Sequence, residues 1–111
     1  MDATFDFSYN PPVAVLSIAG ELDTDNRDQL AWRLVELDAL GTTIVRLDLG
    51  RVSYIDVGSL RLIDDARRRL LGRGAALELG SVTPYFAVVC GLAGYVALAA
   101  QAERLGGEPS S

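Results

Sequence analysis

The sequence predicts an α/β fold, a single domain with a mixed, mostly parallel sheet of about five strands and about four helices. Strand-like and helix-like hydrophobic periods alternate along the chain in the order β-β-α-β-α-β-α-β-α, as they do when helices connect parallel strands. Only Asn10–Pro12 separates the first two strands, and so short a connection favours an antiparallel hairpin. The chain has 111 residues, of which 50% are hydrophobic, enough for one buried core. We expect this domain to cover residues 1–105 and Gly106–Ser111 to form a flexible tail.

The N-terminal part is expected to form the hairpin and the first helix. Thr4–Tyr9 places its aromatic residues on one face, as an edge strand does, and Val13–Ile18 is the second strand, which Gly20 ends. Asp23–Asn26 then supplies N-cap residues and first-turn acids for a helix that Gly41 stops. The apolar positions at helical spacing are Leu30, Ala31, Leu34, Val35 and Leu37.

The middle of the chain is expected to form a central strand and a second helix. Thr43–Leu49 is short and rich in β-branched residues, and the helix follows Tyr54–Ser59 and closes at Gly72. The residues predicted to face the core are Leu60, Ile63, Ala66 and Leu70. The residues predicted to face solvent are Arg61, Asp64, Asp65, Arg67, Arg68 and Arg69.

The C-terminal part is expected to alternate once more between strand and helix. Ala75–Leu79 is a strand, and Pro84 can start a third helix over about Tyr85–Leu92. Tyr95–Leu98 is predicted as a last short strand, and Ala99–Leu105 as a final helical turn or two.

The residue types that the chain lacks exclude several kinds of catalysis. It contains no histidine and no lysine, so all ten basic residues are arginines. Without histidine there is no Ser-His-Asp or Cys-His catalysis and no imidazole metal ligand, and without lysine there is no Walker-type phosphate clamp or Schiff base. No strand is followed by a Gly-x-Gly-x-x-Gly turn. We expect a protein that is not an enzyme and that holds no metal or cofactor.

Charge and hydropathy predict the cellular location of the protein and exclude one class of partner. The formal net charge of −5 argues against a nucleic-acid-binding protein, which needs a basic stripe. The longest uncharged apolar run, Phe86–Ala100, is shorter than the ~20 residues of a spanning helix, and the N-terminus has no basic leader. A single cysteine excludes an internal disulfide. We expect a soluble, cytoplasmic protein without membrane insertion.

Three segments, in order along the chain, carry a family likeness. Gly20–Asp23 reads G-E-L-D between the second strand and the first helix, and Leu47–Asp56 is a strand with a V-x-F/Y-I/M-D approach to a loop. Leu77–Pro84, followed by Gly91 and Leu92, matches the pattern L-x-L-x-x-V-x-P…G-L. Together they resemble the STAS domain, the fold of bacterial anti-sigma factor antagonists and of the cytoplasmic tails of sulphate transporters. The likeness covers nearly the whole chain.

The resemblance implies a protein that binds an anti-sigma factor, itself a serine kinase, and so frees a sigma factor for transcription. In the family the kinase phosphorylates a serine in a D-S-S-G-L or D-S-x-G-L loop at the start of the second helix, which stops the binding, and a phosphatase reverses the modification. The loop here is Asp56-Val57-Gly58-Ser59-Leu60, so Gly58 takes the usual acceptor position and Ser59 is the candidate phosphorylation site. The partner-binding residues that the resemblance implies are Gly20, Glu21, Leu22, Asp23, Thr24, Asp56, Val57, Gly58, Ser59, Leu60 and Arg61.

Ser59 has two interpretations. A phosphate at a helix N-terminus is stabilised by free N–H groups and by the helix dipole. A serine displaced by one residue, however, is rotated ~100° and shifted ~1.5 Å along the helix axis. The alternative is that Asp56 is the N-cap and Ser59 only completes the first turn. Ser53, Thr24 and Tyr54 are lesser candidates for modification.

Other side chains also have a structural and a functional interpretation. Asp23 is both a helix cap and a partner contact, and with Asp56 it is a low-ranked carboxylate pair for acid catalysis or Mg²⁺. Cys90 is expected to be a buried hydrophobe, and Trp32 is either an exposed partner anchor or packed at the sheet edge. Arg67–Arg69 with Arg73 is expected to be a solvated helix face, with binding of an acidic partner or a lipid head group as the alternative.

Three functions therefore compete. The first is a phospho-regulated anti-sigma factor antagonist. The second is a STAS subunit that binds its partner without phosphorylation, in a transport or sensory complex. The third, which the absent histidine and lysine weigh against, is a small enzyme that uses Asp23 and Asp56.

Overall fold

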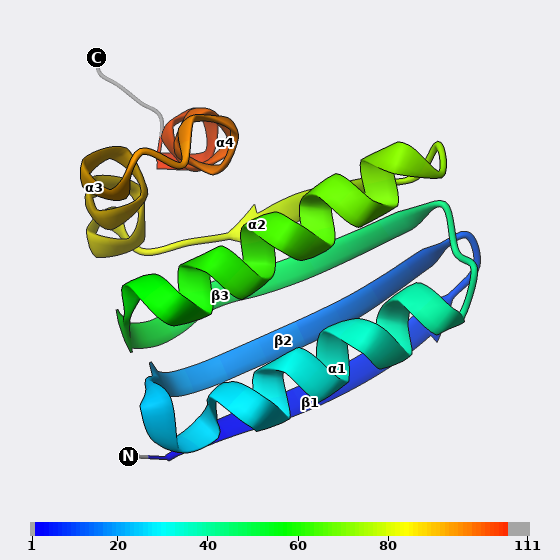
Figure 1. Cartoon of the computed structure of the whole chain (residues 1–111), viewed down its shortest axis with the longest axis horizontal. Helices are drawn as coiled ribbons and strands as arrows, with labels where there is room; N and C mark the ends of the chain where they lie inside the picture. Colours follow the sequence, from blue (N-terminus) through cyan, green and yellow to red (C-terminus); the bar gives the residue numbers. More distant parts are fainter. Residues whose placement is uncertain (1, 107–111) are drawn as a thin grey trace.

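The computed structural model describes residues 2–106, and the predicted tail beyond Gly106 lies outside this range (Figure 1). Four strands, four α-helices and one short 3-10 helix follow one another in this part of the chain. Their bounds are β1 Ala3–Asn10, β2 Val13–Leu22, η1 Thr24–Asn26, α1 Arg27–Ala39, β3 Ile44–Ile55, α2 Val57–Gly72, β4 Ala76–Ser81, α3 Pro84–Ala93 and α4 Val96–Gly106.

The sheet confirms the predicted fold class, with one difference in the number of strands. Its order is β1-β2-β3-β4, with β1 antiparallel to β2, and with β3 parallel to both β2 and β4. The sheet is therefore mixed, with four strands among residues 2–106 where about five were predicted. Helices α1 and α2 lie across the same face of the sheet, and α3 and α4 pack together beside β4 (Figure 1).

The predicted last strand, Tyr95–Leu98, is wrong, because these residues belong to the start of α4. Gly94 adopts the left-handed conformation with φ 84° and ends α3, after which the chain turns and Val96 begins the next helix. A short apolar run does not distinguish a strand from a buried helix by its period. The place of a further strand beside β4 is taken by the side chain of Gln101, which accepts from the amide of Leu79 at 2.9 Å and donates to the carbonyl of Leu77 at 3.1 Å.

Two strands run further than predicted, and this brings their ends to the site described below. Gly20 does not end β2 but continues it with φ 104°, a conformation that favours glycine, and a Cβ there would collide with the carbonyl oxygen of Asp2. Strand β3 extends through Ile55, which is the register partner of Leu22 at the end of β2.

The helix faces follow the predicted pattern with exceptions at Val35, Asp64 and Arg67, of which the Arg67 side chain is 19% exposed. The predicted core positions of α2 are all buried, as are Leu30, Leu34 and Leu37 of α1. Val35, however, is 51% exposed, because it lies away from the sheet. Asp64 was predicted to face solvent but is 2% exposed, and its burial is made possible by the two arginines that pair with it.

Candidate functional site

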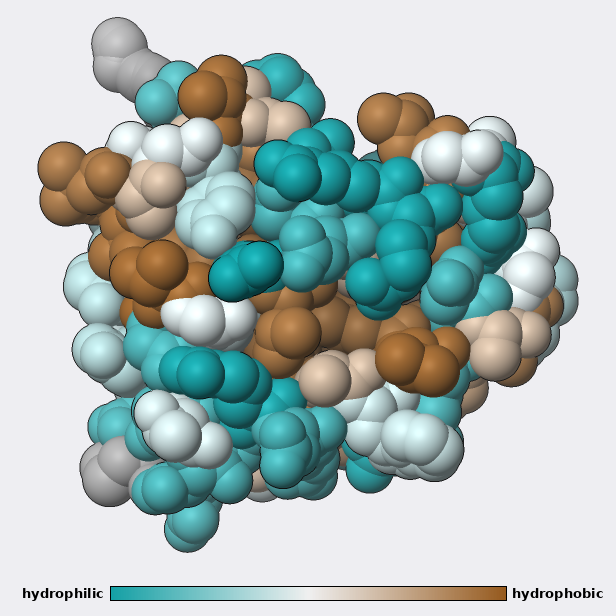
Figure 2. Space-filling view, viewed as in Figure 1, coloured by the Kyte–Doolittle hydropathy of each residue, from teal (hydrophilic) through white to brown (hydrophobic). Residues whose placement is uncertain are grey.

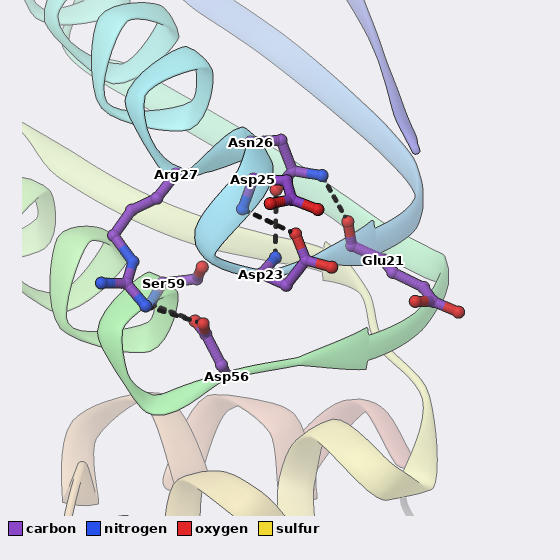
Figure 3. A network of polar contacts seen from close by, with 7 residues as sticks. All are labelled: Glu21, Asp23, Asp25, Asn26, Arg27, Asp56 and Ser59. Carbon is purple, nitrogen blue, oxygen red and sulfur yellow. Dashed lines mark hydrogen bonds and ion pairs between the residues drawn. The ribbon is translucent and has the colours of Figure 1, made fainter. Parts of the chain in front are cut away.

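The predicted partner-binding segments meet where β2 and β3 end side by side. Because these strands are parallel, their carboxyl ends lie at one edge of the sheet, which is where α/β proteins commonly place binding residues. The amide of Asp56 donates to the carbonyl of Leu22 at 3.0 Å and so ties the two strand ends together. Asp23 and Asp56 each follow directly on one of these strands (Figure 3).

Asp23 organises the first of the two turns. Its Oδ1 accepts from the amide of Asp25 at 3.0 Å. Its own amide donates to Oδ1 of Asn26 at 3.0 Å, and its side chain also accepts from the backbone amide of Asn26, so that Asp23 and Asn26 form a capping box. The amide nitrogen of the Asn26 side chain donates to the carbonyl of Glu21 at 2.7 Å. The predicted capping role of Asp23 is confirmed, and the turn before α1 is held by its own polar groups.

Asp56 organises the second turn with both of its carboxylate oxygens. Oδ1 accepts from the amide of Ser59 at 2.8 Å and caps α2, as predicted, and Oδ2 pairs with Nη2 of Arg27 at 2.7 Å. Burial raises the pKa of this carboxyl, but hydrogen bonding from Ser59 and from Arg27 outweighs that effect and leaves the pKa of Asp56 lowered. Asp56 is therefore held as an anion that links α1 to α2.

Arg27 is the member of this site that the sequence interpretation missed. Its side chain reaches from the first residue of α1 to the start of α2 (Figure 3). A Cβ at Gly58 would collide with the guanidinium and would lie 2.8 Å from its Nε, so the two residues fit each other. A basic residue in the first turn of a helix is unfavourable for the helix dipole. This unfavourable position is the signal in the sequence that could have indicated a specific acidic partner for Arg27.

Ser59 lies inside the molecule. Its exposed fraction is 0%, and its Oγ is buried and makes no hydrogen bond of normal geometry. Val57 is 57% exposed, and Gly58 is half-buried beneath Arg27. The hydroxyl that the sequence offers for phosphorylation is thus turned inward, as a one-residue displacement along a helix would produce.

The predicted partner-binding residues differ in how far they are exposed to solvent. Thr24, Val57 and Arg61 are exposed. Gly20, Glu21, Asp23, Asp56 and Gly58 are half-buried. Leu22, Ser59 and Leu60 are buried in the interior of the domain and anchor the two turns to it. The surface that a partner can reach is accordingly formed by the outer residues of the two turns.

Among the lesser candidates for modification, two also have structural contacts. The exposed Ser53 donates from Oγ to the carbonyl of Gly20 at 3.3 Å, and Tyr54 stacks on Tyr85 of α3 with ring centroids 6.3 Å apart.

Exposed apolar side chains continue this surface beyond the predicted residues. On α3, Val88 is 59% exposed and Leu92 is 84% exposed. Figure 2 shows hydrophobic surface over α3 and toward the start of α2. The sequence pattern predicted a helix over about Tyr85–Leu92 but not this exposed apolar side.

The geometry offers little for catalysis or metal binding. Asp23 and Asp56 are both engaged in caps, and residues 2–106 contain no group of three or more His, Cys, Asp or Glu side chains that could hold a metal. Cys90 is buried, and burial together with the charge of Asp64 raises the pKa of its thiol to about 11, which disfavours the thiolate. Trp32 is 62% exposed on α1.

A family model matches this chain, and solved structures share its fold. The family model described as Mlab, STAS domain matches residues 5–99. No curated protein sequence matches the chain significantly. In the part of the chain that the structure describes, none of the helices has the length and apolar character to cross a membrane.

Solved structures share the fold at low sequence identity. An anti-sigma factor antagonist from Mycobacterium paratuberculosis matches with a TM-score of 0.78 and 19% identity over 86% of this chain and 81% of that one. The Bacillus anti-sigma factor antagonist SpoIIAA, in its unphosphorylated form, matches with a TM-score of 0.74 and 16% identity over 97% and 90%. A sulfate transporter family protein from Wolinella succinogenes matches with a TM-score of 0.67 and 19% identity over 83% and 75%. At these identities the likeness shows the fold alone.

Proposed function

The chain belongs to the STAS domain family, and on that basis we propose that it is a protein-binding module of the anti-sigma factor antagonist kind. Its partner is an anti-sigma factor that is also a serine kinase, and binding frees a sigma factor. The observation that carries this proposal is the pairing of the two turns: Arg27 and Asp56 join the start of α1 to the start of α2 at 2.7 Å. A surface fixed before binding loses less conformational entropy when the partner docks.

The chemistry of the exposed residues supports a protein partner. Val57 is an exposed apolar side chain in the first turn of α2, with the charged Arg61 one turn further along the helix and the half-buried Glu21 and Asp23 on the neighbouring turn. Protein interfaces commonly combine an apolar centre with a polar rim. No catalytic step by this chain enters the proposal.

Binding measured by calorimetry tests this role, with the purified chain titrated into the cognate anti-sigma factor. We expect Val57→Asp to weaken binding at least about tenfold, because it replaces an exposed apolar side chain of the proposed interface by a charge. Val35→Asp on α1 is the matched control, since Val35 is 51% exposed and lies outside the two turns. Equal effects of the two substitutions, or no effect of either, would contradict the proposal.

Phosphorylation is a separate part of the proposal, and the position of Ser59 gives it a definite requirement. A kinase reaches the Ser59 hydroxyl only after the first turn of α2 opens, because that hydroxyl is buried. Incubation with the kinase and ATP, followed by mass mapping, tests this step. Phosphate at residue 59 that disappears in Ser59→Ala supports a phospho-regulated antagonist, and the absence of phosphate supports constitutive binding.

A second candidate function is a STAS subunit that binds its partner without phosphorylation, in a transport or sensory complex. Two observations favour it: Gly58 has no hydroxyl, and the Ser59 hydroxyl is buried. The Wolinella structure, a sulfate transporter family protein, carries a name from that side of the family as well. A pull-down from the native cell separates the candidates, since recovery of transporter subunits without sigma regulators favours this second one.

A further inference from the structure

A buried carboxylate on α2 holds two arginine side chains in the same way. Asp64 is 2% exposed, and its Oδ1 and Oδ2 lie 2.9 Å from Nε of Arg67 and 3.0 Å from Nε of Arg68. A guanidinium has five N–H donors, of which Nε–H is only one. The terminal Nη groups of both arginines therefore remain without a hydrogen-bond partner among residues 2–106.

The charges in this cluster do not cancel. Two guanidinium groups face one carboxylate, so the cluster carries an excess of one positive charge in a chain whose formal net charge is −5. A buried carboxylate is costly unless it is paired, and one arginine would suffice for a pair. The second arginine is thus available for an anion from outside the chain.

A groove lies beside these arginines, between α2 and the turn that leads into α4. Its volume is about 410 Å³, and Asp64, Arg67 and Arg68 line it on the α2 side. On the opposite side the lining includes the small residues Gly94, Ala97 and Ala100. Small side chains there leave room for a group of several atoms in front of the Nη donors.

We propose that this groove is a binding site for a small dianion, a phosphate group, which neither the family match nor the proposed function assigns. The Nη groups of Arg67 and Arg68 bind its oxygens, and Asp64 holds both guanidiniums in place. The phosphate is either free in solution or the head group of a phospholipid, since both present the same oxygens.

Titration of the folded chain with inorganic phosphate, followed by amide NMR, tests the site. We expect saturable shifts at the groove residues Gly94, Ala97 and Ala100, and an affinity about tenfold or more lower in Arg68→Ala. The Arg68 side chain is 68% exposed, so its removal leaves the fold intact. Arg69→Ala is the matched control, because Arg69 is also exposed on α2 but does not line the groove.

Co-sedimentation with vesicles of phosphatidic acid, against vesicles of phosphatidylcholine, separates the two sources of phosphate. Saturable binding of inorganic phosphate, with no vesicle binding, identifies a soluble phosphate ligand. Vesicle binding that Arg68→Ala abolishes and Arg69→Ala retains identifies a lipid head group. The proposal is overturned if inorganic phosphate shifts none of Gly94, Ala97 and Ala100 and the phosphatidic acid vesicles do not bind, or if the two variants lose binding equally.

Discussion

Two aspartates, Asp56 at the start of α2 and Asp64 at its middle, both pair with arginine but engage different nitrogens of the guanidinium group. At the start of α2, Asp56 takes a terminal Nη2 of Arg27, and the Nε of that arginine is buried without a partner. At the middle, Asp64 takes the Nε of both Arg67 and Arg68 and leaves their Nη groups free. The Arg27–Asp56 pair joins the turns before α1 and α2, whereas the pairs of Asp64 leave the Nη donors of Arg67 and Arg68 available. The exposed Arg68 therefore keeps its terminal donors available for binding, whereas Arg27 uses one of its own to join the two turns.

The largest effect is expected where a buried charge loses its counterion. Asp64→Ala leaves Arg67 in a largely buried place, with a side chain only 19% exposed, and without an anion beside it. We expect a loss of about 3 kcal/mol in the free energy of unfolding, measured by urea denaturation. Asp65→Ala, the neighbouring carboxylate on the same helix, should change it by less than about 0.5 kcal/mol. Similar losses in the free energy of unfolding for both variants would contradict a stabilising role of the Asp64–Arg67 pair.

A smaller effect is expected at the start of α2. Asp56→Ala removes a helix cap and a partly exposed ion pair, and we expect it to lower the free energy of unfolding by about 1–2 kcal/mol in urea denaturation. Asp56→Asn keeps the capping oxygen and should lose clearly less. If the two variants are equally destabilised, the ion pair with Arg27 outweighs the cap.

The same carboxyl makes stability depend on pH in a defined direction. The pKa of Asp56 is lowered from its model-compound value of 3.8 in the folded chain, so the anion contributes stability above that value. This contribution is lost as pH falls below about 4 and through the folded pKa. Urea denaturation at several pH values should show a shallower acid loss for Asp56→Asn than for the unmodified chain. Parallel curves would show that Asp56 is not stabilised as an anion.

A change of sign is expected at Gly58. In the unmodified chain Gly58→Ala collides with the Arg27 guanidinium and should lower the free energy of unfolding by about 1 kcal/mol. In an Arg27→Ala background the space is free, and the same substitution should raise it by about 0.5–1 kcal/mol, because alanine favours a helix over glycine. A double-mutant cycle measures this coupling. Additive effects would show that Arg27 does not occupy this position.

The smallest effect on stability is expected for Arg68→Ala. Its side chain is 68% exposed, so the free energy of unfolding should change by less than about 0.5 kcal/mol. A larger loss in urea denaturation would mean that Arg68 supports the fold, and the contrast with Arg27 would disappear.

The sequence predicted the features of the fold that repeat along the chain and missed those that depend on single contacts. Alternating hydrophobic periods gave the layered α/β arrangement and the core face of α2. They did not reveal that Gln101 would take the place of a strand beside β4, because one side chain leaves no period.

The candidate site shows the same division. The caps at Asp23 and Asp56 were predicted, because capping depends on neighbours in the sequence. Arg27 was missed, because its partner Asp56 is 29 residues away. Asp64 was assigned to solvent because a charged residue is seldom buried unless it is paired, and its pairing with two arginines became apparent only in the folded chain.

The side chain of Gln101 also limits how this domain can associate through its sheet. By bonding to the backbone of Leu77 and Leu79, it occupies the outer hydrogen-bonding edge of β4. Within residues 2–106, β1 is then the edge strand whose backbone stays available to another chain. A molecule with one usable edge can join its sheet to one neighbour. Association by strand addition therefore ends at a pair of chains and does not propagate into a fibre.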